Sequence, residues 1–91
     1  GEQVIDQAAL EFLSLAASRL PEISNQSVSY FEVYETTVDI DAVLESGLKV
    51  RFDTSRKAEV ALKALKRVLE SFGPQIKQYV DLRVEGWAYY Q

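Results

Sequence analysis

Two stretches of alternating hydrophobic and polar residues, separated by a short loop, constrain the fold of this chain most. They cover residues 37–44 and 48–53, and the loop between them is Glu45-Ser46-Gly47. A period of two is typical of strands that bury one face. A three-residue loop that ends in a left-handed glycine is a common connection between antiparallel strands. The pattern therefore predicts a β-hairpin over residues 37–53.

The length of the loop fixes which residues of the hairpin face each other. Ala42 is expected opposite Val50, and Asp41 opposite Arg51. Hydrophobic residues then meet hydrophobic ones and opposite charges meet, so the register is self-consistent. We expect the Asp41–Arg51 pair to be exposed and to contribute about 0.2–1 kcal/mol.

Two further segments carry hydrophobic residues at helical spacing. The first covers residues 6–20, and Pro21 is expected to end it because proline pushes the preceding residue out of the helical region. The second covers residues 55–72. Polar residues 54–55 are expected to cap its start, and Gly73-Pro74 to end it.

Two further strands are predicted, one before the hairpin and one after the second helix. Residues 28–35 are rich in β-branched and aromatic side chains, and residues 79–84 alternate again. The order is helix, three-strand antiparallel meander, helix, terminal strand. We therefore expect an α+β fold with the helices packed on one face of the sheet, and a single domain over residues 1–91.

The end of the chain, YVDLRVEGWAYYQ at residues 79–91, is the strongest candidate for a binding surface. A terminal strand with unpaired backbone groups is a template for strand addition, and Trp and Tyr are enriched in interface hot spots. Trp87 either closes the core or belongs to a patch that faces a partner, and Gly86 is expected to bulge the strand and re-aim Trp87. The side chains expected to anchor the strand to the helices are those of Val80, Leu82 and Val84.

The composition argues against an enzyme. The chain has no Cys and no His, so the usual nucleophile, general base and transition-metal ligand are missing. Asp39 and Asp41 are paired carboxylates, but a position opposite Arg51 explains them structurally. No glycine-rich phosphate loop is present, and the net charge of −4 argues against nucleic acid. We expect no catalytic residues, no metal and no cofactor.

The charge is unevenly distributed along the chain. Residues 1–46 hold nine acidic residues and one basic residue, whereas residues 47–91 hold nine basic and five acidic residues. Two interpretations stay open: the acidic strands face the basic helix or water, or the surface is polarised and steers a charged partner. The basic side of the second helix consists of Arg56, Lys57, Lys63, Lys66 and Arg67.

Three features of the second half of the chain carry a family resemblance. They are the GLKVRF strand at residues 47–52, the helix with Leu62, Leu65 and Leu69, and above all YVDLR at residues 79–83. A similar strand-helix-strand run, ending in a Tyr-Val/Ile-Asp-Leu-Arg strand, is found in the β domain of the FtsQ/DivIB family of bacterial cell-division proteins. The chain resembles the C-terminal part of that domain.

The resemblance implies a scaffold without catalysis. Proteins of that family have a short cytoplasmic tail, one membrane helix, a POTRA domain and the β domain. The terminal strands of the β domain take up a strand from FtsB or DivIC, which pairs with FtsL. This chain departs from the pattern after Arg83, where only Val-Glu precedes Gly-Trp and relatives have a longer turn. The partner-binding residues implied are Arg83, Val84, Glu85, Gly86, Trp87, Ala88 and Tyr89.

Together these observations predict a non-enzymatic interaction domain of the division machinery, on the extracytoplasmic side of the cell membrane. Gly1 is typical of a cleaved tag, so we expect an excised C-terminal fragment of a longer, membrane-anchored protein. Its expected partners are FtsB/DivIC-like and FtsL-like proteins, with no nucleic acid and no small-molecule substrate. The alternative is a small cytosolic α+β module that homodimerises through the terminal strand and binds a small ligand.

Overall fold

The computed structural model describes residues 7–34, 38–84 and 87–91. The expected α+β class is confirmed, since two long helices and a five-stranded sheet make up the domain. In chain order the elements are α1 (Gln7–Ser24), β1 (Val28–Val33), β2 (Asp39–Leu44), β3 (Lys49–Asp53), α2 (Ala58–Phe72), the 3-10 turn η1 (Gly73–Gln75), β4 (Tyr79–Asp81) and β5 (Tyr89–Tyr90).

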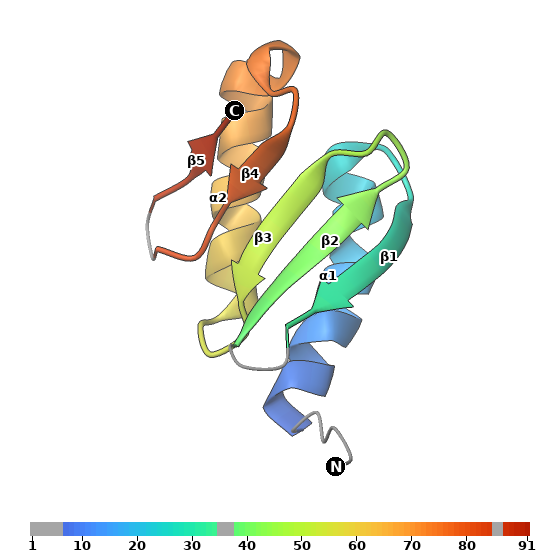
Figure 1. The fold of residues 1–91 in the computed structure, drawn as a ribbon. Helices are drawn as coiled ribbons and strands as arrows, with labels where there is room; N and C mark the ends of the chain where they lie inside the picture. Colours follow the sequence, from blue (N-terminus) through green and yellow to red (C-terminus); the bar gives the residue numbers. More distant parts are fainter. Residues whose placement is uncertain (1–6, 35–37, 85–86) are drawn as a thin grey trace.

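The strands follow one another across the sheet in sequence order (Figure 1). β1, β2 and β3 form the predicted antiparallel meander, and α2 carries the chain over to β4, which runs parallel to β3. The predicted terminal edge strand is wrong in one respect. The end of the chain forms two short strands, so β4 lies inside the sheet and β5, antiparallel to it, is the edge.

The hairpin of β2 and β3 has the predicted register. Ala42 faces Val50 and Asp41 faces Arg51. Gly47 has φ of 92°, the left-handed conformation that the three-residue loop requires, and its N–H donates to the Leu44 carbonyl at 2.8 Å. The register could be predicted because the loop and both strands are local in sequence.

Side chains from both helices and from the sheet form one hydrophobic core. Phe12 of α1 packs edge-on against Phe52 of β3 with ring centroids 5.4 Å apart, and Leu65 of α2 is fully buried. In Figure 1 both helices lie behind the sheet. The opposite face of the sheet, turned towards the viewer, is called the open face below.

The prediction that Pro21 ends α1 is wrong, because the helix continues to Ser24. Leu20 is fully buried and Ile23 packs against the core, so burial on both sides of the proline outweighs its local preference. The helix ends instead at Asn25, which has φ of 58° and donates its N–H to the Pro21 carbonyl at 3.0 Å. A left-handed asparagine is a known helix terminator.

The predicted cap of α2 is also wrong, because the helix begins later, at Ala58. The Thr54 hydroxyl donates to the carbonyl of Val38 at 2.8 Å and so stabilises the end of the sheet instead. The helix ends at Phe72, as predicted. Gly73 has φ of −46° and continues into η1 rather than forming a left-handed cap.

Candidate functional site

The structure distributes the predicted partner-binding residues over separate parts of the domain rather than along one edge. Glu85 and Gly86 lie outside the described residues, and with them the predicted bulge. The other five occupy three places: Arg83 in an ion-pair network of the sheet, Val84, Trp87 and Ala88 beside α2, and Tyr89 in β5.

The outer edge of β5 is an edge of the sheet. Tyr79 and Gln91 exchange both backbone hydrogen bonds, each at 3.1 Å. Hydrogen-bonded and non-hydrogen-bonded pairs alternate in an antiparallel ladder. The neighbouring pair Val80–Tyr90 is therefore a non-hydrogen-bonded pair. The N–H and C=O of Tyr90 therefore point away from β4, towards the free edge.

The two tyrosines of β5 lie on opposite faces of the sheet. Tyr90 stacks on Phe72 of α2, with ring centroids 5.5 Å apart and an angle of 21° between the rings. Tyr89 lies opposite Asp81 on the open face and is 54 % exposed. Tyr90 thus fixes the edge strand to α2, and Tyr89 is presented to solvent.

The Asp41–Arg51 pair is buried on the side of its carboxylate, which corrects the prediction of an exposed pair. The Asp41 side chain is 0 % exposed. Arg51 donates to it twice, from Nε at 2.7 Å and from Nη2 at 3.0 Å, and the hydroxyl of Tyr34 donates at 2.8 Å. The sequence correctly predicted that Asp41 pairs with Arg51. It did not predict the burial of Asp41, because Tyr34 and the neighbouring strands that cover its carboxylate come from other parts of the sequence.

These contacts shift the pKa values of the groups in opposite directions. Burial alone would raise the pKa of Asp41, but the hydrogen bonds from Arg51 and Tyr34 outweigh it and hold that pKa below its usual value. The hydrogen bond to Asp41 raises the pKa of Tyr34 to about 12. An ionised, fully bonded carboxylate with a low pKa is a poor general base at neutral pH.

Arg83 forms the second half of the network on the open face. Its Nη2 lies 2.8 Å from Asp81, and its Nη1 lies 2.9 Å from Asp39. Burial would raise the pKa of Asp81, but hydrogen bonds from the side chain and backbone of Arg83 lower it overall. Arg83 therefore connects the end of β4 to β2, and its predicted contact with a partner stays a prediction.

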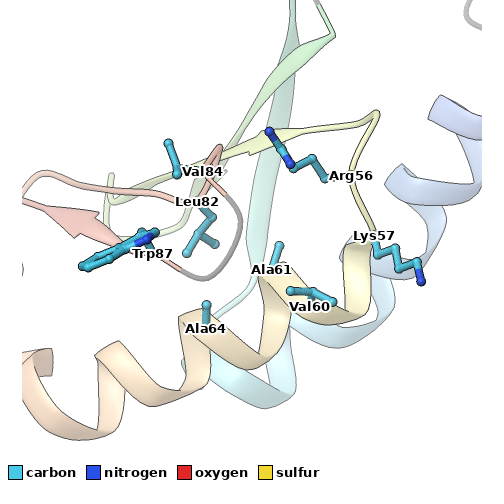
Figure 2. Close-up of a pocket in the computed structure, with 8 residues that line it drawn as sticks. All are labelled: Arg56, Lys57, Val60, Ala61, Ala64, Leu82, Val84 and Trp87. Atoms are coloured by element: carbon cyan, nitrogen blue, oxygen red, sulfur yellow. The ribbon is translucent and has the colours of Figure 1, made fainter.

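Trp87 does not close the core, because it is 64 % exposed. Figure 2 shows it beside a hollow that lies between Leu82, Val84 and the first turns of α2, where Ala61 and Ala64 form the floor. The free space of about 10 Å³ at this point is that of roughly one water molecule. Val84 also lines the hollow but is 48 % exposed, so the prediction that it anchors the strand to the helices is wrong.

Sequence reasoning missed the part that α2 has in this site. Val60, Ala64 and Val68 line hollows on the side of α2 that faces Trp87 and Ala88. Their spacing of four residues places them on one stripe of α2 that borders the core, and Val68 itself is buried in the core. That spacing is a signal that the sequence carries, although it does not show which element lies next to the stripe.

Within residues 7–34, 38–84 and 87–91, no group of three or more Asp and Glu side chains is placed to hold a metal ion. Neither α1 nor α2 is long and hydrophobic enough to cross a membrane. Comparison of the chain with models of protein families, with curated proteins and with solved structures found no match.

Proposed function

We propose that this domain is a non-enzymatic protein-interaction scaffold that accepts a strand of a partner protein along the outer edge of β5. One observation carries the proposal: β5 is an edge strand whose Tyr90 backbone groups point outwards, next to the exposed side chain of Tyr89. Unpaired backbone groups at a sheet edge bind extended segments by adding a strand.

The added strand gains affinity from two sources. Backbone hydrogen bonds form with Tyr90, and alternate side chains contact either Tyr89 on the open face or the Tyr90–Phe72 stack on the helix side. Because β5 has only two residues, its backbone offers few hydrogen bonds, and the aromatic side chains supply much of the contact area.

The other edge of the sheet, β1, is less suited to strand addition. Its pairing with β2 contains an irregularity between Val28 and Tyr30, and Glu32 places a charge in the strand. Irregular pairing and charged side chains are the means by which natural sheets protect their edges. The proposal therefore places the partner at β5.

The resemblance of residues 47–52 and 79–83 to the FtsQ/DivIB family supplies the biological context of the proposal. The domain then belongs to the bacterial cell-division machinery, on the extracytoplasmic side of the membrane, and is anchored through a segment other than the one present here. Its partner is an FtsB/DivIC-like protein, which in turn pairs with an FtsL-like one. Because β5 is an edge strand, its outer side is accessible to such a partner.

Titration of the isotope-labelled domain with a synthetic peptide of an FtsB-like partner tests this proposal by NMR. We expect shifts of the amides in residues 79–81 and 87–91, and binding at least about tenfold weaker after Tyr89→Ala. Tyr30→Ala is the matched control, because Tyr30 is 52 % exposed at the opposite edge. Shifts confined to β1, or equal losses in both variants, would refute the proposal.

Sedimentation distinguishes the alternative of a homodimer through the same edge. A monomer at all concentrations supports the scaffold. A tight dimer that Tyr89→Ala converts to monomers supports the homodimeric module instead, because Tyr89 lies in β5.

A further inference from the structure

We propose that a groove along α2 binds an acidic amphipathic helix of a partner protein. The α2 groove consists of two adjacent hollows that share Val60 and Ala64; one lies below Trp87, and the other extends to Phe72 and Ala88. The groove lies on the helix side of the sheet, so its occupation does not require strand addition at β5.

The floor of the groove is hydrophobic and suits the apolar stripe of a helix. From Val60 to Phe72, α2 rises by about 18 Å, which matches roughly three helical turns of a partner. The small side chains of Ala61 and Ala64 allow close approach, and Trp87 flanks the floor on the side opposite α2 (Figure 2). The free space widens from about 10 Å³ beside Trp87 to about 360 Å³ at the Phe72 end.

The charge around the groove defines the chemistry of the partner. In the described part of the chain, every charged residue that lines the groove is basic, although the chain as a whole has a net charge of −4. These residues are Arg56, Lys57, Lys63 and Arg67. A hydrophobic floor with a basic rim is complementary to a helix that carries leucine-like side chains flanked by Asp and Glu.

The other side of α2 provides an internal comparison. The hollow between α1 and α2 shares Lys63 with the groove, but it is lined by charges of both signs, including Arg19, Glu22, Lys66 and Glu70. The basic character is therefore a property of the groove and not of the whole helix surface. Among the described residues, no acidic group lies within ion-pair distance of Lys63 or Arg67.

An anionic membrane is the main competing occupant of a basic and hydrophobic surface. A lipid surface is broad, and binds helices that present their hydrophobic face outwards. Here the hydrophobic residues line a narrow depression between α2 and the side chains of Leu82, Val84, Trp87 and Ala88, and it is widest at the Phe72 end. The shape therefore favours a protein segment.

Trp87 is the only tryptophan of the chain, so its fluorescence reports on the groove directly. The probe is a synthetic peptide of roughly 16 residues without Trp, with Leu on one helical face and Glu beside it; its counterpart carries Lys instead of Glu. We expect a saturable blue shift with the Glu peptide that weakens as salt is raised, and no shift with the Lys peptide.

Arg67→Glu and Lys66→Glu form a matched pair of exposed charge reversals on adjacent residues of α2, and only Arg67 lines the groove. Arg67→Glu is expected to weaken binding of the Glu peptide at least about tenfold and to permit binding of the Lys peptide, whereas Lys66→Glu changes binding by less than about twofold. Circular dichroism verifies that both variants are folded.

Equal effects of the two reversals, or preference for the Lys peptide, would overturn the proposal. So would a blue shift that occurs only with phosphatidylglycerol vesicles. Tyr89→Ala is expected to leave the fluorescence titration unchanged, because Tyr89 lies on the open face. A failure of strand addition at β5 and a failure of the groove are therefore separate results.

Discussion

Replacement of Asp41 by Asn isolates the contribution of the buried carboxylate to stability. The substitution preserves the shape of the side chain and removes its charge. In the structure, Arg51 Nε donates to one carboxylate oxygen, whereas Arg51 Nη2 and the Tyr34 hydroxyl both donate to the other. An asparagine has one acceptor oxygen, so one or two of these three hydrogen bonds are lost whichever way the amide is oriented.

The magnitude follows from these contacts. A hydrogen bond to a charged group contributes about 1.5–3 kcal/mol, and breaking a fully buried ion pair costs about 3–5 kcal/mol. The Arg51 side chain is 36 % exposed and gains hydration when its partner is neutralised, which reduces the cost. We expect Asp41→Asn to lower the free energy of unfolding by about 2–3 kcal/mol, and Tm by roughly 10–20 °C in a domain of this size.

Urea unfolding followed by circular dichroism measures this change, and Asp53→Asn is the control. Asp53 lies on the same hairpin, but its nearest contact with Arg56 is 3.8 Å, and its hydrogen bond from the Ser55 N–H can be kept by an amide oxygen. The control is expected to cost less than about 1 kcal/mol. A double variant with Arg51→Gln then gives the coupling energy between Asp41 and Arg51.

Similar free energies of unfolding for Asp41→Asn and Asp53→Asn would refute the reasoning. That result would mean that hydration of Arg51 compensates fully for the lost charge. A coupling energy below about 0.5 kcal/mol in the double-mutant cycle would refute it as well, since residues in direct contact normally couple more strongly.

Three further predictions concern pH and backbone conformation. Folding lowers the pKa values of Asp41 and Asp81 below the ordinary 3.8, so the stability that these carboxylates provide is complete above that pH and is lost as pH falls through the folded values. Measurement of the free energy of unfolding from pH 6 to 2 checks this. Asp41→Asn is expected to reduce the dependence of that free energy on pH. Folding raises the pKa of Tyr34 from 10.0 to about 12, so its contribution is present below pH 10 and is lost towards pH 12; Tyr34→Phe is expected to remove this alkaline loss in the same assay. Gly47→Ala is expected to cost about 1 kcal/mol through its φ of 92° alone, because no atom lies within 4 Å of the added Cβ; a cost near zero in urea unfolding would contradict this.

The parts of the fold that sequence reasoning predicted correctly are those with local causes. The hairpin register depends on one short loop and two adjacent strands, and its pairs are observed as predicted. Pro21 shows the opposite case. Its local preference is overruled by the burial of Leu20, which depends on how α1 meets the rest of the core.

The candidate site was harder to predict because its parts come from distant segments. The sequence identifies Trp87 and Tyr89 as unusual, but only the pairing of β4 with β3 and of β5 with β4 separates the two side chains. As a result, Trp87 lies beside α2, whereas Tyr89 lies on the open face. Local alternation cannot show that β4 ends at Asp81, since its end depends on its neighbours.

The run Tyr79–Arg83 carries the family resemblance, and its last four residues each have a structural role. Val80 and Leu82 are buried in the core, and Asp81 and Arg83 belong to the network that connects β4 to β2. The run is therefore needed to build this sheet whether or not the domain binds a partner. We therefore expect specificity for a partner to depend on the exposed side chains of Trp87 and Tyr89 and on the side of α2 beside Trp87. Exchange of residues 87–91 between this domain and one with a different partner is thus expected to transfer binding, whereas exchange of residues 79–83 is not.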